Sequence, residues 1–181
     1  MARYVAFLRG MNVGGHRVTS AELRELFAGM GFDGAATFRT SGNVIFDAGD
    51  EEARDDVRAR VEQGLEAALG YAVPTFLRDA TETRAIAAHE PFDPDVVAAS
   101  KGKLQVVLLE TAPDSRTRDA VLAHATEDDR LDVHGRELYW LPSGGTLDSQ
   151  LDLKAIAGLV GLTTMRTKGT IDLIAAKHCA G

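Results

Sequence analysis

Short apolar runs and helically spaced apolar residues alternate along the chain, and this pattern predicts its secondary structure. Residues 4–8 are an unbroken apolar run that ends at Arg9 and a glycine-rich segment, as in a buried strand followed by a loop. Thr19 and Glu22 then form a capping box in front of apolar residues at helical spacing. Over the first 79 residues the pattern predicts strand, helix, a two-strand hairpin, helix and edge strand, at 4–8, 19–31, 35–39, 44–46, 50–69 and 72–77. This is the βαββαβ order of a ferredoxin-like unit.

The same order starts again in the second half of the chain. Strands are expected at 104–109, 131–133 and 137–141, and helices after 111, at 148–160 and at 170–177. We therefore predict an α+β fold, a tandem duplication of ferredoxin-like βαββαβ units with antiparallel sheets and an extra C-terminal helix. The expected domains are residues 1–79, a linking helix over 80–99, and 100–181 with the C-terminal helix. The last helix is expected where the closing strand of the second unit would stand.

Composition and charge narrow the function classes. The chain has 181 residues, 45% of them hydrophobic, and a formal net charge of −7, which disfavours sequence-blind binding to nucleic acid. No stretch approaches the roughly 20 apolar residues of a membrane span, and the single cysteine, Cys179, cannot form an internal disulfide. We expect a cytoplasmic protein with no membrane partner. The pattern predicts no oligomeric state.

Both alternating residue sets of 4–8 and of 104–109 are largely apolar, so both faces of each central strand should be covered. An open sheet face for stacking RNA bases is therefore not expected. Residues 39–46, RTSGNVIF, faintly resemble an RNA-recognition motif but lack its stacking aromatic residues.

Topology predicts one candidate site. In a βαββαβ unit the loop after the first strand and the hairpin turn between the next two strands share an edge of the sheet. Glycines let the backbone approach an anion, and a following helix N-terminus and arginines supply positive charge. The predicted binding residues are Arg9, Gly10, Asn12, Gly14, Gly15, Arg17, Arg39, Ser41, Gly42 and Asn43. The spacing of Gly10 and Gly15 resembles a P-loop, but His16 and Arg17 stand where that motif needs lysine and a hydroxyl residue.

A second candidate anion site precedes the last helix. Arg166, Lys168 and Thr170 bring two cations and a hydroxyl to a helix N-terminus. Threonines are also common N-caps, so a purely structural role is the alternative.

No catalytic set, metal site or cofactor is predicted. The five histidines lack paired metal-ligand spacing, the acidic run Glu127–Asp129 is expected to be solvated, and residues 141–146 are expected to form a plain turn. The first hypothesis is a protein that binds a small anionic ligand, phosphate-bearing or nucleotide-type, at the glycine-rich edge. The alternatives are an enzyme acting on a phosphorylated or carboxylated metabolite at the same edge, and a nucleic-acid-associated module.

Several segments resemble a known family. Residues 8–15, LRGMNVGG, together with 21–24, 31–32 and 41–44, resemble the N-terminal signature of the bacterial domain-of-unknown-function 1697 family, most closely over residues 3–47. The resemblance implies duplicated ferredoxin-like α+β units and no established activity.

The chain also departs from that family's pattern. Gln150 stands where the resemblance implies lysine, and Thr40 where it implies glutamine. Thr167, Lys168 and Gly169 stand where it implies Asn-Trp-Asn. A ligand that stacked on that tryptophan would not be bound in the same way here, which favours the glycine-rich edge over the second cluster.

Overall fold

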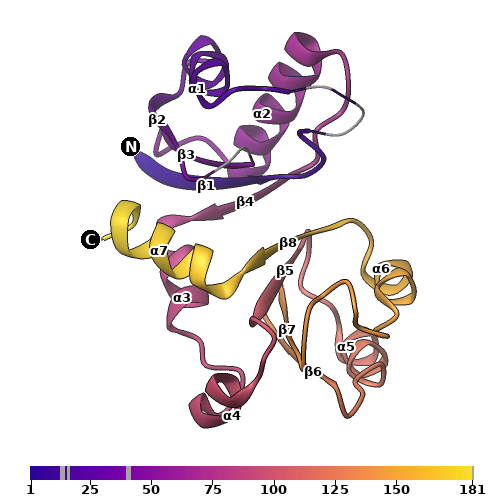
Figure 1. Ribbon diagram of the computed structural model, residues 1–181. Helices are drawn as coiled ribbons and strands as arrows, with labels where there is room; N and C mark the ends of the chain where they lie inside the picture. The colour runs from indigo at the N-terminus through magenta and orange to yellow at the C-terminus, as the bar shows by residue number, and fades with distance from the viewer. Residues whose placement is uncertain (13–14, 16, 40–41, 181) are drawn as a thin grey trace. The chain divides into compact units, whose positions relative to one another are not determined.

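The computed structural model describes residues 1–12, 15, 17–39 and 42–180 (Figure 1). The chain forms two compact units: unit 1 consists of Met1–Ala85 and Ile174–Gly181, and unit 2 of Ile86–Leu173. Within the described residues, each unit contains one four-stranded antiparallel sheet. The prediction of an α+β fold built from duplicated ferredoxin-like units is confirmed.

The sheet of unit 1 has the strand order β2-β3-β1-β4. Its strands are β1 (Ala2–Leu8), β2 (Asp33–Thr37), β3 (Asn43–Ala48) and β4 (Thr75–Asp79). The predicted edge strand is β4, and Pro74 lies just before it, where a missing N–H interrupts no ladder. The carbonyl of Pro74 accepts a hydrogen bond from the Arg9 N–H at 3.0 Å, which ties the end of β1 to the start of β4.

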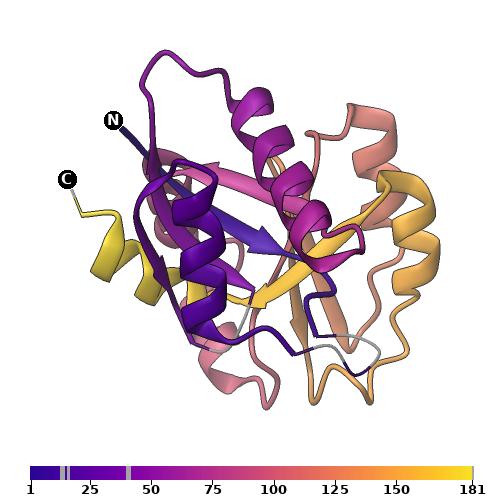
Figure 2. The same cartoon turned by 90° about the horizontal axis from the view of Figure 1, so that it is seen from above.

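Two helices, α1 (Ser20–Gly29) and α2 (Arg54–Leu69), lie side by side on one face of this sheet (Figure 2). Leu23 and Phe27 of α1 are fully buried against Phe46 and Val61 in the core of the unit. The capping box is present: Glu22 accepts from the Thr19 N–H at 2.7 Å, and Thr19 Oγ1 accepts from the Glu22 N–H at 3.2 Å. The first helix therefore begins where the sequence predicted.

Residues after Ile174 belong to unit 1, and two arginines hold them. Arg3 forms a bidentate pair with Asp47 at 2.8 and 2.9 Å and donates to the His178 carbonyl at 3.1 Å. Arg84 donates to the Cys179 carbonyl at 2.7 Å. This arrangement differs from the expected boundaries, which assigned the whole C-terminal helix to the second unit.

The sheet of unit 2 has the order β6-β7-β5-β8 and carries α5 (Ser115–Leu122) and α6 (Leu153–Val160). Its strands are β5 (Gln105–Leu109), β6 (Asp129–His134), β7 (Glu137–Pro142) and β8 (Thr163–Thr167). The prediction that the last helix replaces the closing strand was wrong, because β8 pairs with β5 as β4 pairs with β1. The threonines of this segment, at positions 163, 164, 167 and 170, suggested helix caps. Met165, however, packs against the core from a strand.

The remaining helices are α3 (Ala80–Ala88), α4 (Pro94–Ala99) and α7 (Lys168–His178). The segment expected to be one linking helix thus contains two, since Asp93 caps a new helix with Pro94 in its first turn. The strand-to-helix junctions of the two units are built alike. Asp79 at the end of β4 accepts from the Glu82 N–H, and Thr167 at the end of β8 accepts from the Thr170 N–H.

Both central strands are covered on both faces, as predicted. Tyr4–Leu8 and all of β5 are buried, including residues of both alternating sets.

Candidate functional site

The loop after β1 and the turn between β2 and β3 lie together at one end of the sheet of unit 1. The Leu8 N–H donates to the Gly42 carbonyl at 2.7 Å, and Phe7 pairs with Asn43 in the ladder. We call this end the glycine-loop edge; its described residues are Arg9, Gly10, Asn12, Gly15, Arg17, Arg39, Gly42 and Asn43. Gly14 and Ser41, and with them His16 and Thr40, lie outside the described residues.

The backbone at this edge takes conformations that L-residues avoid. Gly10, Gly15 and Gly42 have φ values of 71°, 85° and 120°, which glycine adopts without steric cost. Arg39 has a φ of 58°, and it is the one non-glycine residue with positive φ in the described part of the chain. A left-handed conformation costs an ordinary residue about 1–2 kcal/mol, so the surrounding turn holds Arg39 in place.

Two amides predicted to bind a ligand also support the backbone. Asn43 is buried and its Nδ2 donates to the Phe38 carbonyl at 3.2 Å, which closes the turn. Asn12 Oδ1 accepts from the Val18 N–H at 3.3 Å. Tyr71 further fixes the loop, because its hydroxyl donates to the Met11 carbonyl at 2.9 Å.

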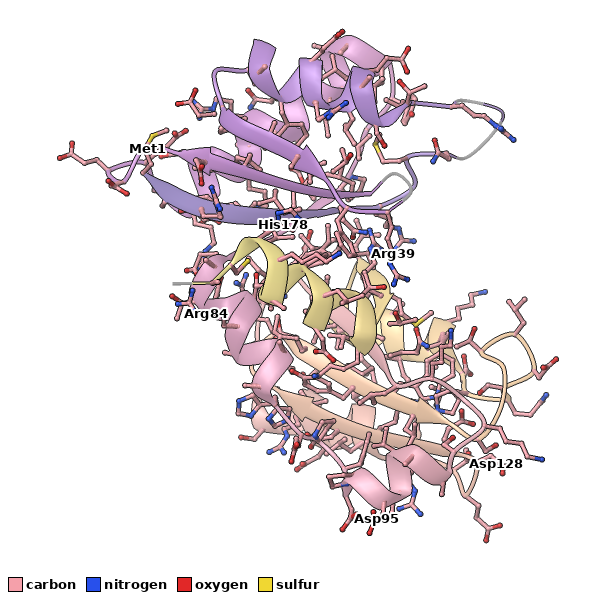
Figure 3. All side chains as sticks on the ribbon, turned by 60° about the vertical axis from the view of Figure 1, so that its left-hand side comes forward. Met1, Arg39, Arg84, Asp95, Asp128 and His178 are labelled. Carbon is pink, nitrogen blue, oxygen red and sulfur yellow. The ribbon has the colours of Figure 1, made fainter. Side chains whose placement is uncertain are left out.

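The cations of this edge face solvent. Arg9, Arg17 and Arg39 are exposed, and the Arg39 guanidinium carbon lies 5.7 Å from the centre of the Phe38 ring (Figure 3). Cation–π contacts of this kind at exposed sites contribute about 0.5–1 kcal/mol. The edge therefore offers exposed guanidinium groups, and a Cβ added at Gly15 would meet only open space.

The second predicted cluster is engaged within unit 2. Arg166 donates to Thr164 Oγ1 at 3.0 Å and to the Met165 carbonyl at 2.8 Å, and its burial lowers its pKa to about 10. Lys168 Nζ donates to the Ala87 carbonyl at 2.6 Å and to Asp172 at 2.7 Å. The Thr170 hydroxyl lies 2.9 Å from that of Thr167. These partners give all three residues a structural role, and their anion-binding role stays a prediction.

Among the described residues, no group of three or more histidine, cysteine, aspartate or glutamate side chains could hold a metal ion. In the same part of the chain, no helix is both long enough and apolar enough to cross a bilayer.

Comparison with models of known protein families identifies one family that matches this chain. A family model described as a protein of unknown function, DUF1697, matches residues 1–139. The chain belongs to the DUF1697 family. The match covers the whole glycine-loop edge and ends within β7, so the altered C-terminal cluster of this DUF1697 protein lies beyond it.

A solved structure is similar to this DUF1697 chain over nearly its full length. The conserved bacterial protein SP0830 from Streptococcus pneumoniae is 19% identical, with 97% of each chain covered and a TM-score of 0.70. At this identity the likeness shows the fold alone. A comparison with curated proteins found no match.

Sequence reasoning missed two features of the DUF1697 chain. The left-handed backbone of Arg39 has no sequence signal, because glycine or asparagine is expected at such a position. Two cavities of about 510 and 220 Å³ lie in unit 2, and neither is lined by a predicted site residue. Their walls include the acidic run Glu127–Asp129 and the turn after β7, which were expected to be plain surface.

Proposed function

We propose that unit 1 binds a small anionic ligand, phosphate-bearing or nucleotide-type, at the glycine-loop edge. The observation that carries the proposal is Arg39: a charged, exposed residue with a φ of 58°. Glycine would relieve this conformation at no steric cost, so the side chain itself is the reason to keep arginine there.

The position of Arg39 supports an anion rather than another ligand. Arg9 directly follows β1 and Arg39 precedes the turn whose Gly42 carbonyl accepts from Leu8. Two arginines therefore approach one edge from two connections of the chain. Guanidinium groups form paired, charge-assisted hydrogen bonds with phosphate oxygens, and the exposed glycines Gly10 and Gly15 carry no side chain that would keep an anion from the backbone.

Isothermal titration calorimetry of the full chain with inorganic phosphate, pyrophosphate and AMP tests the proposal. We compare Arg39→Gly, which removes the guanidinium and accepts the backbone conformation, with Arg39→Lys, which keeps the charge. One lost charge-assisted hydrogen bond contributes about 1.5–3 kcal/mol, so Arg39→Gly should weaken binding at least about tenfold and Arg39→Lys less.

The matched control is Arg24→Gln, which removes the charge of an exposed arginine on the same unit. Glutamine is used in place of glycine because Arg24 lies inside α1, where glycine would weaken the helix. This control should bind each probe as the parent does. If none of the probes binds at millimolar concentration, or if Arg39→Gly binds them as tightly as the parent, the anion site is absent from this edge.

The enzyme alternative predicts more than binding. Product formation from a phosphorylated or carboxylated metabolite that is lost in Arg39→Gly would favour it. Gel shifts with nucleic acid that persist at physiological salt would favour the nucleic-acid alternative, against the net charge of −7.

A further inference from the structure

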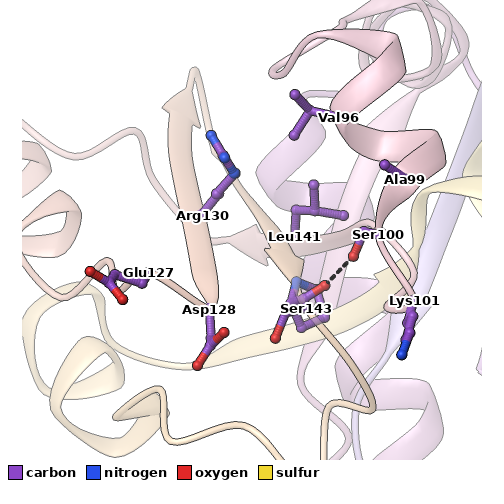
Figure 4. A pocket seen from close by; sticks show the side chains of 10 residues that line it. Val96, Ala99, Ser100, Lys101, Glu127, Asp128, Arg130, Leu141 and Ser143 are labelled. Carbon is purple, nitrogen blue, oxygen red and sulfur yellow. Dashed lines mark hydrogen bonds between the residues drawn. The ribbon is translucent and has the colours of Figure 1, made fainter.

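The cavity of about 510 Å³ in unit 2 lies between α4, the start of β6 and the end of β7 (Figure 4). Its volume is within the range of about 300–1,000 Å³ that is typical of small-molecule sites. Its lining combines an apolar part, formed by Val96, Leu141 and Pro142, with charged side chains of both signs. We call it the α4–β7 pocket.

The two acids of this pocket lie across from Lys101. Figure 4 shows Glu127 and Asp128 on one side, Lys101 on the opposite side and Ser143 between them. Arg130 lies on β6, the strand that follows Asp128, on the side of the acids. The described structure gives none of the four charged side chains an ion pair or a side-chain hydrogen bond. Elsewhere the same residue types are paired with each other, as Arg60 is with Glu52 at 3.0 Å.

The backbone around the pocket is fixed although its charges are not paired. Ser100 Oγ donates to the Pro142 carbonyl at 2.7 Å and accepts from the Gly102 N–H at 3.1 Å. The Ser143 N–H donates to the Asp128 carbonyl at 2.8 Å. A Cβ on Gly102 would lie 2.2 Å from the Pro142 carbonyl oxygen, so this close approach requires glycine. Three segments of the chain are thus held together before any ligand arrives, which lowers the entropy cost of binding.

We propose that the α4–β7 pocket binds a small zwitterion with an apolar body, such as a free amino acid or a short peptide. Its ammonium group pairs with Glu127 and Asp128, its carboxylate pairs with Lys101, and its apolar body covers Leu141 and the other apolar wall residues. The four charges sum to zero, so a simple anion meets the two acids and a simple cation meets the two bases. A molecule that carries both charges complements both sides.

Titration of the ¹⁵N-labelled full chain followed by NMR tests this proposal. The probes are leucine and the dipeptide Leu-Leu, which share the two charges and differ in their separation. Leucinamide, which lacks the carboxylate, and N-acetylleucine, which lacks the ammonium, are the matched probes with one charge. We expect leucine or Leu-Leu to shift the amide signals of residues 100–102, 128–130, 141 and 143, and each one-charge probe to bind roughly tenfold more weakly.

Two variants test whether charged side chains of the pocket contribute to binding. Lys101→Gln and Asp128→Asn should each weaken binding of the better zwitterion roughly five- to tenfold. Both side chains are exposed and without an intramolecular ion pair, so both variants should fold. Arg116→Gln and Asp119→Asn, exposed charges on α5, are the controls and should leave binding unchanged.

Three outcomes would overturn the proposal: no shift with either zwitterion at millimolar concentration, equal binding of a one-charge probe, or unchanged binding in both pocket variants. The glycine-loop edge does not enter this test. Arg39→Gly should bind the zwitterion as the parent does, so the two proposals fail independently.

Discussion

Asp129 is a buried acid whose replacement should destabilise unit 2. It is 1% exposed, and its Oδ1 accepts hydrogen bonds from Trp140 Nε1 at 2.8 Å and from Ser149 Oγ at 2.6 Å. Its Oδ2 accepts from Thr126 Oγ1 at 3.0 Å. Asp129→Leu removes every acceptor at once and leaves the indole N–H of the fully buried Trp140 without a partner.

The size of the loss in stability depends on which of the three donors can form a hydrogen bond to water instead. Thr126 is exposed and Ser149 is half-buried, so their hydroxyls can turn to solvent, whereas the Trp140 N–H cannot. Hydrogen bonds to a charged group contribute about 1.5–3 kcal/mol, and a buried unsatisfied donor costs about 1–3 kcal/mol. We expect Asp129→Leu to lower the free energy of unfolding by about 3 kcal/mol. Asp129→Asn keeps an oxygen acceptor and should cost about 1 kcal/mol.

Urea unfolding followed by far-UV circular dichroism measures these differences. Trp140 is the single tryptophan, so its fluorescence reports on unit 2 in all variants that keep it. The control is Asp128→Asn, the exposed neighbouring acid, which should stay within about 0.5 kcal/mol of the parent.

A double-mutant cycle with Trp140→Phe isolates the hydrogen bond between the two side chains. It should give a coupling energy of about 1–3 kcal/mol. If Asp129→Leu unfolds within about 0.5 kcal/mol of the parent, or if the two substitutions are additive, the buried hydrogen bond does not stabilise the unit.

Three further predictions concern unit 1. In the same urea assay, Arg39→Gly should raise the free energy of unfolding by about 1 kcal/mol and Arg39→Ala should not. The reason is that only glycine relieves the left-handed backbone conformation. Equal stability of the two variants would contradict this prediction. Hydrogen bonds from Arg3 hold the pKa of Asp47 below its usual range, so the pair stabilises the unit above about pH 4 and this contribution is lost as the pH falls through the lowered pKa. Asp47→Asn should therefore destabilise the protein at pH 7, with the difference from the parent shrinking toward pH 2 in unfolding curves, and a constant difference would refute the assignment. Burial raises the pKa of the Cys179 thiol, so Ellman's reagent should label the native chain many times more slowly than the urea-unfolded chain. Arg84→Ala should speed labelling of the native chain, because it removes the hydrogen bond to the Cys179 carbonyl. Equal labelling rates in native and unfolded protein would show that this segment is not packed.

The fold was predictable because its strongest signals are local. The apolar runs at 4–8 and 104–109 and the Thr19–Glu22 capping box each determine their element without help from distant residues. The closing strand β8 was missed because its five residues carry three threonines, which suit both a strand and a helix cap. Only pairing with β5, about 60 residues earlier in the chain, selects the strand.

For the candidate site, the sequence predicted which segments lie close together, but it did not predict the conformations or the hydrogen-bond partners of their residues. Strand order is enough to bring Leu8 to Gly42. The conformation of Arg39 depends on the closed turn around it, and the partners of Lys168 depend on where the Ala87 carbonyl falls after folding. The α4–β7 pocket could not be predicted either, because it joins residues near 100, 128 and 142 whose separate patterns indicate only surface.

Unit 1 is discontinuous in the chain, and this has a consequence for synthesis. Residues 1–85 leave the ribosome before the 88 residues of unit 2, and residues 174–180 follow only afterwards. At 5–20 residues per second this interval lasts roughly 4–18 s, during which Arg3 and Arg84 lack the carbonyl groups of His178 and Cys179. We therefore expect unit 1 to form its last hydrogen bonds only after the whole of unit 2 has been synthesised.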